Sequence, residues 1–273
     1  MGKNILRVIL FLTVFALLFG CVSFVLTPKD VSEESGIHEP HAKGFLSEPE
    51  NSLDVLFLGN SATYVHDLPG TLGRLAQQAG YRLTCDSIAK PSITASFHAD
   101  AATEHGQTVL KTIQKGYDIV FLQDNGNCIS SEEMRLASQN AYRTLGAAIH
   151  AAGARAGIYF RPPYGYEKWG RDPIAQCREF DRHFGEIAES IKSVNAYVNR
   201  AFAQAIRHTD FDVWGPDHAH TSEHGAYLAV CVFFCAIFGE SSAVLGDNGL
   251  PHADARVLQD IADRIMLRGE LPW

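Results

Sequence analysis

Short apolar runs alternate with longer stretches of helical period along most of the chain. The runs that predict strands are residues 53–58, 82–89, 119–122, 156–160 and 195–198. The stretches that predict helices are residues 67–79, 108–115, 132–152, 172–193, 202–208, 223–238 and 255–268. This alternation, without internal repeats, predicts an α/β domain with a parallel sheet. Sites in such domains form beyond the carboxyl ends of the strands, so residues just after the strands are the first candidates for function.

The first residues have a different pattern. After Lys3 and Arg7, residues 8–26 carry no charge, and a helix that crosses the hydrocarbon core needs about 20 such residues. We expect residues 1–26 to be a signal anchor, with the positive flank in the cytoplasm and the rest of the chain outside it. A lipoprotein signal acylated at Cys21 and a plain cleaved signal are the alternatives.

The remaining chain divides into a tether and one folded domain. Residues 27–51 are polar and without period, which is typical of a tether, and residues 52–273 form the domain. We therefore expect a membrane-anchored domain in the cell envelope. The sequence has 273 residues, 46% of them apolar, enough for one sizeable core.

Charge and cysteine content exclude several classes of function. The chain carries 23 Lys and Arg against 31 Asp and Glu, a net charge of -8, so it has no broad basic face and nucleic acid is not an expected partner. Six cysteines do not form a disulfide framework in a chain of this length. Cys231 and Cys235 lie in an apolar helical run, where we expect them to be small buried hydrophobic residues.

Two segments carry candidate chemistry. Ser61 follows Gly59 and Asn60 at the end of the first strand, where a tight turn would expose its hydroxyl above the sheet, although Gly-Asn-Ser is also ordinary turn chemistry. Asp217 precedes His220 by three residues, so its carboxylate can orient the imidazole as a base. The clustered histidines 218, 220 and 224 raise the alternative of zinc, but no glutamate stands in a metalloprotease-like position, and we predict no metal.

The order of these segments resembles the SGNH/GDSL hydrolase superfamily. It is most similar to a bacterial branch with a G-N-S-x-T-Y block followed by D-L-P, and a late D-x-x-H-x-S-x-x-G-x-Y-L block. Here these blocks are residues 59–64 with 67–69, and residues 217–228. The resemblance implies a flavodoxin-like three-layer α/β domain with a parallel five-stranded sheet. It also implies a triad of Ser61 as nucleophile, His220 as general base and Asp217 as its orienting partner.

The middle blocks imply an oxyanion hole. The stretch that is Gly-Gly-x-(Ser/Thr)-Leu-x-x-His in the branch corresponds to residues 91–98, with Ser92 at a glycine position. Ser tolerates positive φ poorly, so the backbone N–H of Ser92 is a donor whose geometry depends on that turn. Gln123, at the end of a strand that reads Val-Phe-Leu-Gln, is the expected side-chain donor, with Asn125 second. The alternative for Gln123 is a strand-end amide that caps a loop.

The resemblance implies a serine esterase that acts through an acyl-enzyme without any cofactor. The expected substrates are small O-acyl esters, often acetyl groups, on envelope or extracellular carbohydrates. An O-acyltransferase with the same triad and a non-catalytic glycan-binding protein are the alternatives. The loop after the fourth strand holds Tyr164, Tyr166 and Trp169, which would form either a carbohydrate-stacking rim or a hydrophobic lid over the core.

Overall fold

The computed structural model describes residues 52–273. The predicted membrane segment 1–26 and tether 27–51 lie outside this part of the chain. Within residues 52–273 no helix combines the length and the apolar character needed to cross a membrane.

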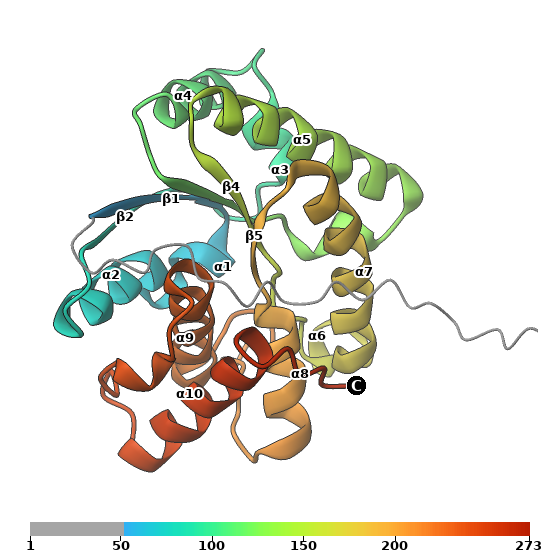
Figure 1. Cartoon of the computed structure of the whole chain (residues 1–273). Helices are drawn as coiled ribbons and strands as arrows, with labels where there is room; N and C mark the ends of the chain where they lie inside the picture. Colours follow the sequence, from blue (N-terminus) through green and yellow to red (C-terminus); the bar gives the residue numbers. More distant parts are fainter. Residues whose placement is uncertain (1–51) are drawn as a thin grey trace, which may run out of the picture. The chain divides into compact units, whose positions relative to one another are not determined.

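A parallel sheet of five strands forms the centre of the domain, as predicted, in the order β2-β1-β3-β4-β5. This is the flavodoxin-like order, in which the connections change direction between β1 and β3. The strands are β1 (Leu53–Gly59), β2 (Leu83–Ala89), β3 (Ile119–Leu122), β4 (Arg155–Tyr159) and β5 (Val194–Ala196). Because all five run the same way, the residues that follow them share one edge of the sheet (Figure 1).

Helices cover both faces of the sheet and complete the three layers (Figure 1). On one face lie α3 (Ala95–Ala99), α4 (Glu104–Ile113), α5 (Glu132–Ala151) and α7 (Pro173–Ile191). On the other lie α2 (Leu68–Gln78), α8 (Val198–His208), α9 (Glu223–Phe238) and α10 (His252–Met266). Short helices follow the strands or link the others: α1 (Ser61–Tyr64), α6 (Tyr166–Trp169), η1 (Val65–Asp67), η2 (Gly126–Ile129) and η3 (Ser242–Val244).

The aromatic ring of Phe233 on α9 is the centre of the core. It makes edge contacts with Phe57, Phe121 and Tyr159 from three neighbouring strands, at centroid distances of 5.1, 5.0 and 4.9 Å. Gly157 leaves room for this cluster, since a Cβ at that position would overlap the Phe121 ring. α9 is apolar on nearly all sides, as expected for a helix enclosed by protein, and both of its cysteines are buried as predicted.

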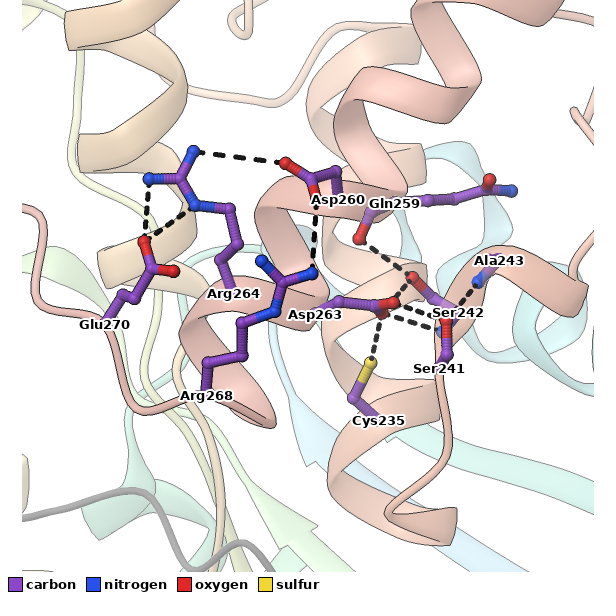
Figure 2. A network of polar contacts seen from close by, with 10 residues as sticks. All are labelled: Cys235, Ser241, Ser242, Ala243, Gln259, Asp260, Asp263, Arg264, Arg268 and Glu270. Atoms are coloured by element: carbon purple, nitrogen blue, oxygen red, sulfur yellow. Dashed lines mark hydrogen bonds and ion pairs between the residues drawn. The ribbon is translucent and has the colours of Figure 1, made fainter.

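Besides the apolar packing of α10 on α9, one carboxylate links α10 to the segment that follows α9 (Figure 2). Asp263 accepts hydrogen bonds from the Ser242 backbone N–H at 2.8 Å, the Ser242 hydroxyl at 2.9 Å and the Ser241 hydroxyl. The Cys235 thiol also lies 3.4 Å from it. One residue on, Arg264 pairs with Glu270 and ties down the C-terminal segment.

Element boundaries differ from the prediction mainly where capping decides them. α4 begins four residues earlier than predicted because the Thr103 hydroxyl accepts from the Gly106 N–H and caps the helix. α8 begins at Val198 instead of residue 202, directly after β5. The short helices α1, α3 and α6 were not predicted, because four or five residues are too few to establish a hydrophobic period.

Candidate active site

Ser61 is the first residue of α1 and lies two positions beyond the end of β1. Asn60 caps this helix by accepting a hydrogen bond from the Ala62 N–H at 3.2 Å. Within residues 52–273, neither the Ser61 hydroxyl nor its backbone N–H has a hydrogen-bond partner. The turn therefore presents both groups at the carboxyl edge of the sheet, as an attacking group and an oxyanion donor require.

The Gln123 side chain lies beneath this turn and is 2% exposed. Its Oε1 accepts from the Asn60 N–H at 2.8 Å and from the Thr63 hydroxyl at 3.2 Å. These donors fix the orientation of the amide, so Nε2 donates to the carbonyl of Asp124. In this structure Gln123 holds the turn that carries Ser61, and Nε2 would have to leave Asp124 to reach an oxyanion.

Ser92 lies in a tight turn with φ of 58°, in the left-handed region that favours glycine. Two amides bring the turn to the Ser61 segment: Asn125 Nδ2 donates to the Ser92 carbonyl at 3.2 Å, and Asn60 Nδ2 donates to the Ile93 carbonyl at 3.0 Å. The Ser92 N–H has no partner within residues 52–273. Two backbone N–H groups, those of Ser61 and Ser92, are thus available as donors, whereas the amides of both Gln123 and Asn125 are engaged.

Asp217 and His220 form a close pair, with Oδ2 of the carboxylate 2.6 Å from Nδ1 of the ring. The other oxygen, Oδ1, accepts from the backbone N–H groups of Ala219 and His220, each at 3.0 Å. Partial burial alone would raise the pKa of Asp217, but these hydrogen bonds and the imidazole outweigh it and hold the pKa well below its usual range. The carboxylate is therefore ionised and orients Nδ1–H, which leaves Nε2 as the basic nitrogen.

The segment after Ser61 and the segment after His220 are joined directly. Nε2 of His66, the middle residue of η1, lies 2.8 Å from the Thr221 carbonyl, and η1 packs against α9. Thr221 in turn forms an isolated antiparallel bridge with Trp214, which stiffens the Asp217–His220 loop. No hydrogen bond joins Ser61 to His220, whose side chain is 36% exposed. Such bonds are often long in free enzymes and tighten when substrate binds.

The three clustered histidines have three different carboxylate partners. His218 Nδ1 lies 3.2 Å from Glu167, on α6, and His224 Nε2 lies 3.1 Å from Asp254, on α10. Only His220 is paired with Asp217. In the described part of the chain, no three His, Cys, Asp or Glu side chains are grouped so that they could hold a metal ion.

The aromatic loop after β4 packs against the Asp217–His220 loop. The Trp214 indole donates to the Pro163 carbonyl at 3.0 Å, and the Gly165 N–H donates to the His218 carbonyl at 2.8 Å. Tyr166 is 60% exposed, as a stacking rim requires. Tyr164 is half-buried over the guanidinium of the buried Arg161, 4.2 Å from ring centroid to Cζ, and so covers the core. The side chain of Trp169 lies outside what the structure describes.

Several residues around the site were not singled out from the sequence. Asn60, His66 and Asp124 support the turns of Ser61, His220 and Ser92, and His98 contacts the end of β1. Asp124 Oδ1 accepts from the N–H groups of Ala95 and Asn125 at 3.0 and 2.8 Å. Asn60 has a local signal, as an Asn at a helix N-cap, and His98 stands at the His position of the block aligned with residues 91–98. His66 and Asp124 had no such signal, because they support segments elsewhere in the chain.

Comparisons with known proteins rest on structure. No family model matches the chain, and no curated protein matches its sequence. A DUF4886 family protein from Bacteroides uniformis superposes with a TM-score of 0.69 at 13% identity, covering 81% of this chain and 97% of that one. A protein from Slackia heliotrinireducens that carries the name SGNH hydrolase superposes with a TM-score of 0.58 at 22% identity, covering 67% and 97%.

An acetylxylan esterase from Geobacillus stearothermophilus gives a TM-score of 0.53 at 16% identity, covering 70% of this chain and 96% of that one. At these identities the likeness establishes the architecture. The chain therefore shares the fold of solved structures named as SGNH hydrolase and acetylxylan esterase.

Proposed function

We propose that the chain is a serine esterase that hydrolyses small O-acyl esters through an acyl-enzyme. The observation that carries the proposal is the Asp217–His220 pair, whose loop is joined through Thr221 and His66 to the segment that presents Ser61. The shared fold with an acetylxylan esterase supports ester chemistry, with acetyl as the proposed acyl group.

In the proposed mechanism, Nε2 of His220 removes the Ser61 proton as Oγ attacks the carbonyl carbon of the ester. The backbone N–H groups of Ser61 and Ser92 stabilise the negative charge that develops on the carbonyl oxygen. Gln123 is the proposed third donor, once its amide is released from Asp124. The imidazolium, held by Asp217, gives its proton to the leaving alcohol, and water then hydrolyses the acyl-enzyme by the same steps.

Solvent access favours hydrolysis over acyl transfer. The side chains of Asp217 and His220 are 50% and 36% exposed, so water can reach the position from which it would attack the acyl-enzyme. A transferase needs a drier site shaped for its acceptor. The exposed Tyr166 beside this loop supports a carbohydrate as the alcohol, and the envelope location expected from residues 8–26 would bring glycans within reach.

The test is active-site labelling combined with turnover. We expect a fluorophosphonate to label the full chain at Ser61, located by peptide mass spectrometry, and the chain to hydrolyse p-nitrophenyl acetate and acetylated glycans. Ser61→Ala and His220→Ala should each lower turnover by about 10³-fold or more, and the double variant should lose little beyond that, because triad members act as a unit. Asp217→Asn should lose less.

His218→Ala is the matched control. This histidine neighbours the pair but contacts Glu167, so near-normal turnover is expected. Labelling at Ser222, or at no serine, would contradict the triad. Release of acyl groups only when a sugar acceptor is added would favour the transferase, and glycan binding without labelling would favour the non-catalytic alternative.

A further inference from the structure

Two histidines behind the Ser61 turn have no part in the proposed mechanism. His98, on α3, is 1% exposed, and its Nε2 lies 3.0 Å from the carbonyl oxygen of Gly59. His105, on α4, reaches the other ring nitrogen, with Nε2 3.1 Å from His98 Nδ1. These two contacts form a row from His105, near the protein surface, through His98 to Gly59, the last residue of β1.

The Gly59 carbonyl at the end of this row determines which ring nitrogens carry a hydrogen. A carbonyl only accepts, so His98 Nε2 carries a hydrogen. Burial lowers the pKa of His98 to about 4, and the nearby His105 and Lys90 act in the same direction against the Gly59 bond. The ring is neutral near pH 7, its Nδ1 is an acceptor, and His105 Nε2 must supply the hydrogen. The donors therefore point one way, from His105 to His98 to Gly59.

The carbonyl that His98 holds belongs to the Gly59–Asn60 peptide unit, which is separated from the Ser61 peptide by the Cα of Asn60. The N–H of this unit is that of Asn60, which donates to Gln123 Oε1 at 2.8 Å. The plane of the Gly59–Asn60 peptide is therefore held at both ends, by an imidazole on one side and an amide on the other. Gly59 allows this close support, since a Cβ there would lie 2.7 Å from Gln123 Oε1 and overlap the Thr63 hydroxyl.

We propose that His98 is a positioning residue for Ser61, which fixes the rotation of the Gly59–Asn60 peptide, and that His105 holds His98 in the tautomer this requires. The inference rests on the proposed function, because it assigns His98 a role in the reaction of Ser61. Asn60 links this peptide to Ser61, so a change in its orientation displaces both the N–H and the side chain of Ser61. A displacement of about 1 Å in a reacting group can cost about 10²-fold in rate, so a residue remote from substrate affects kcat.

The test compares variants that keep or remove the donor. His98→Leu removes it at similar volume, whereas His98→Gln places an amide N–H near the position of the ring Nε2–H. We expect His98→Leu to lower both kcat for p-nitrophenyl acetate and the rate of Ser61 labelling by about 10-fold or more, with KM within about 2-fold. His98→Gln should restore most of the rate, and His105→Leu should give an intermediate loss.

His150→Leu is the matched control. Its Nε2 also bonds a backbone carbonyl, that of Ile191 at 2.9 Å, but at the opposite edge of the sheet. It should lower stability without a change in kcat. A His98→Leu variant that behaves like this control, or a His98→Gln variant no faster than His98→Leu, would overturn the proposal.

A second measurement does not depend on turnover. Hydrogen exchange of the Asn60 amide, followed by NMR, should accelerate in His98→Leu and not in His150→Leu, because only the former frees the Gly59–Asn60 peptide. Unchanged exchange at Asn60 would overturn the positioning role. If that exchange accelerates but the unmodified chain neither hydrolyses esters nor labels at Ser61, the proposed function fails, and His98 is left with a role in folding alone.

Discussion

Ser92 adopts a backbone conformation that an L-residue holds only at a cost. Its φ of 58° lies in the left-handed region, where a side chain costs about 1–2 kcal/mol, while glycine loses about 0.5–1 kcal/mol through its freedom in the unfolded chain. We expect Ser92→Gly to preserve or raise kcat, because the N–H donor remains, and to keep the free energy of unfolding within about 1 kcal/mol. Esterase kinetics and urea denaturation check this.

Ser190→Gly, in α7, is the comparison for Ser92. Ser190 lies in the last turn of α7, away from the carboxyl ends of the strands, so glycine there should destabilise the domain by under about 1 kcal/mol with kcat unchanged. Loss of activity in Ser92→Gly, with stability retained, would show that the Ser92 side chain itself contributes to the site.

The Gln123 amide has a structural role in the Ser61 turn and a proposed role at the oxyanion, and one variant distinguishes them. Gln123→Leu leaves the buried Asn60 N–H without its acceptor, which costs about 1–3 kcal/mol, and moves the turn that carries Ser61. We expect stability and kcat to fall together. A drop in kcat of about 10²–10³ with stability intact would instead show that Nε2 serves the oxyanion. Asn125→Ala, which loses the Ser92 contact, should lower kcat with a smaller loss of stability.

Among the elements, α10 adds to its apolar packing on α9 a network centred on one half-buried carboxylate, Asp263. Asp263→Ala removes the acceptor of the Ser242 N–H and of three side chains at the junction of α9, η3 and α10 (Figure 2). We expect a loss of about 2–3 kcal/mol in the free energy of unfolding, since an unsatisfied buried donor is costly, and no change in kcat. Denaturation followed by circular dichroism measures it.

Asp260, one turn earlier on α10, provides the control for Asp263. Its side chain is 54% exposed, and its contacts with Arg264 and Arg268 are long surface pairs of 3.9 and 3.7 Å. Asp260→Ala should therefore cost under about 1 kcal/mol. Equal losses in the two variants would refute the role given to the Asp263 network.

At the scale of the whole molecule, we expect two buried histidines to make the folded domain less stable in acid. Burial lowers the pKa of His98 and of His183 to about 4, and the unfolded chain protonates both near 6.5. Between these values the unfolded state binds more protons, so stability is complete above about pH 6.5 and falls as the pH approaches 4. We expect a loss of about 2 kcal/mol per histidine between pH 7 and pH 5.

Urea denaturation at the two pH values tests this, with His183→Gln as the diagnostic variant. It should be less stable than the unmodified chain at pH 7, because the contact with Ser138 is changed, yet lose about half as much stability on going to pH 5. An undiminished pH dependence in this variant would mean that the acid sensitivity has another source. Asp217 contributes to the pH dependence of stability only at lower pH, since its pKa is depressed below its usual range.

The sequence by itself determined the layers of the domain and the order of its elements. The run 119–122 and the helix 223–238 were predicted with the bounds that the structure has, because a strand buried on both faces and a helix enclosed by protein are apolar throughout. It also placed Ser61, Ser92 and Gln123 after successive strands and predicted the buried cysteines, since these properties depend on local pattern.

Only the tertiary structure decided how those segments support one another. The bond of His66 to Thr221, the engagement of the Gln123 amide with Asn60, and the contact of His98 with Gly59 each join residues tens of positions apart. No local pattern encodes such pairs. They arise because a parallel sheet brings the carboxyl ends of its strands to one edge, where buried polar groups must find partners among whichever loops meet there.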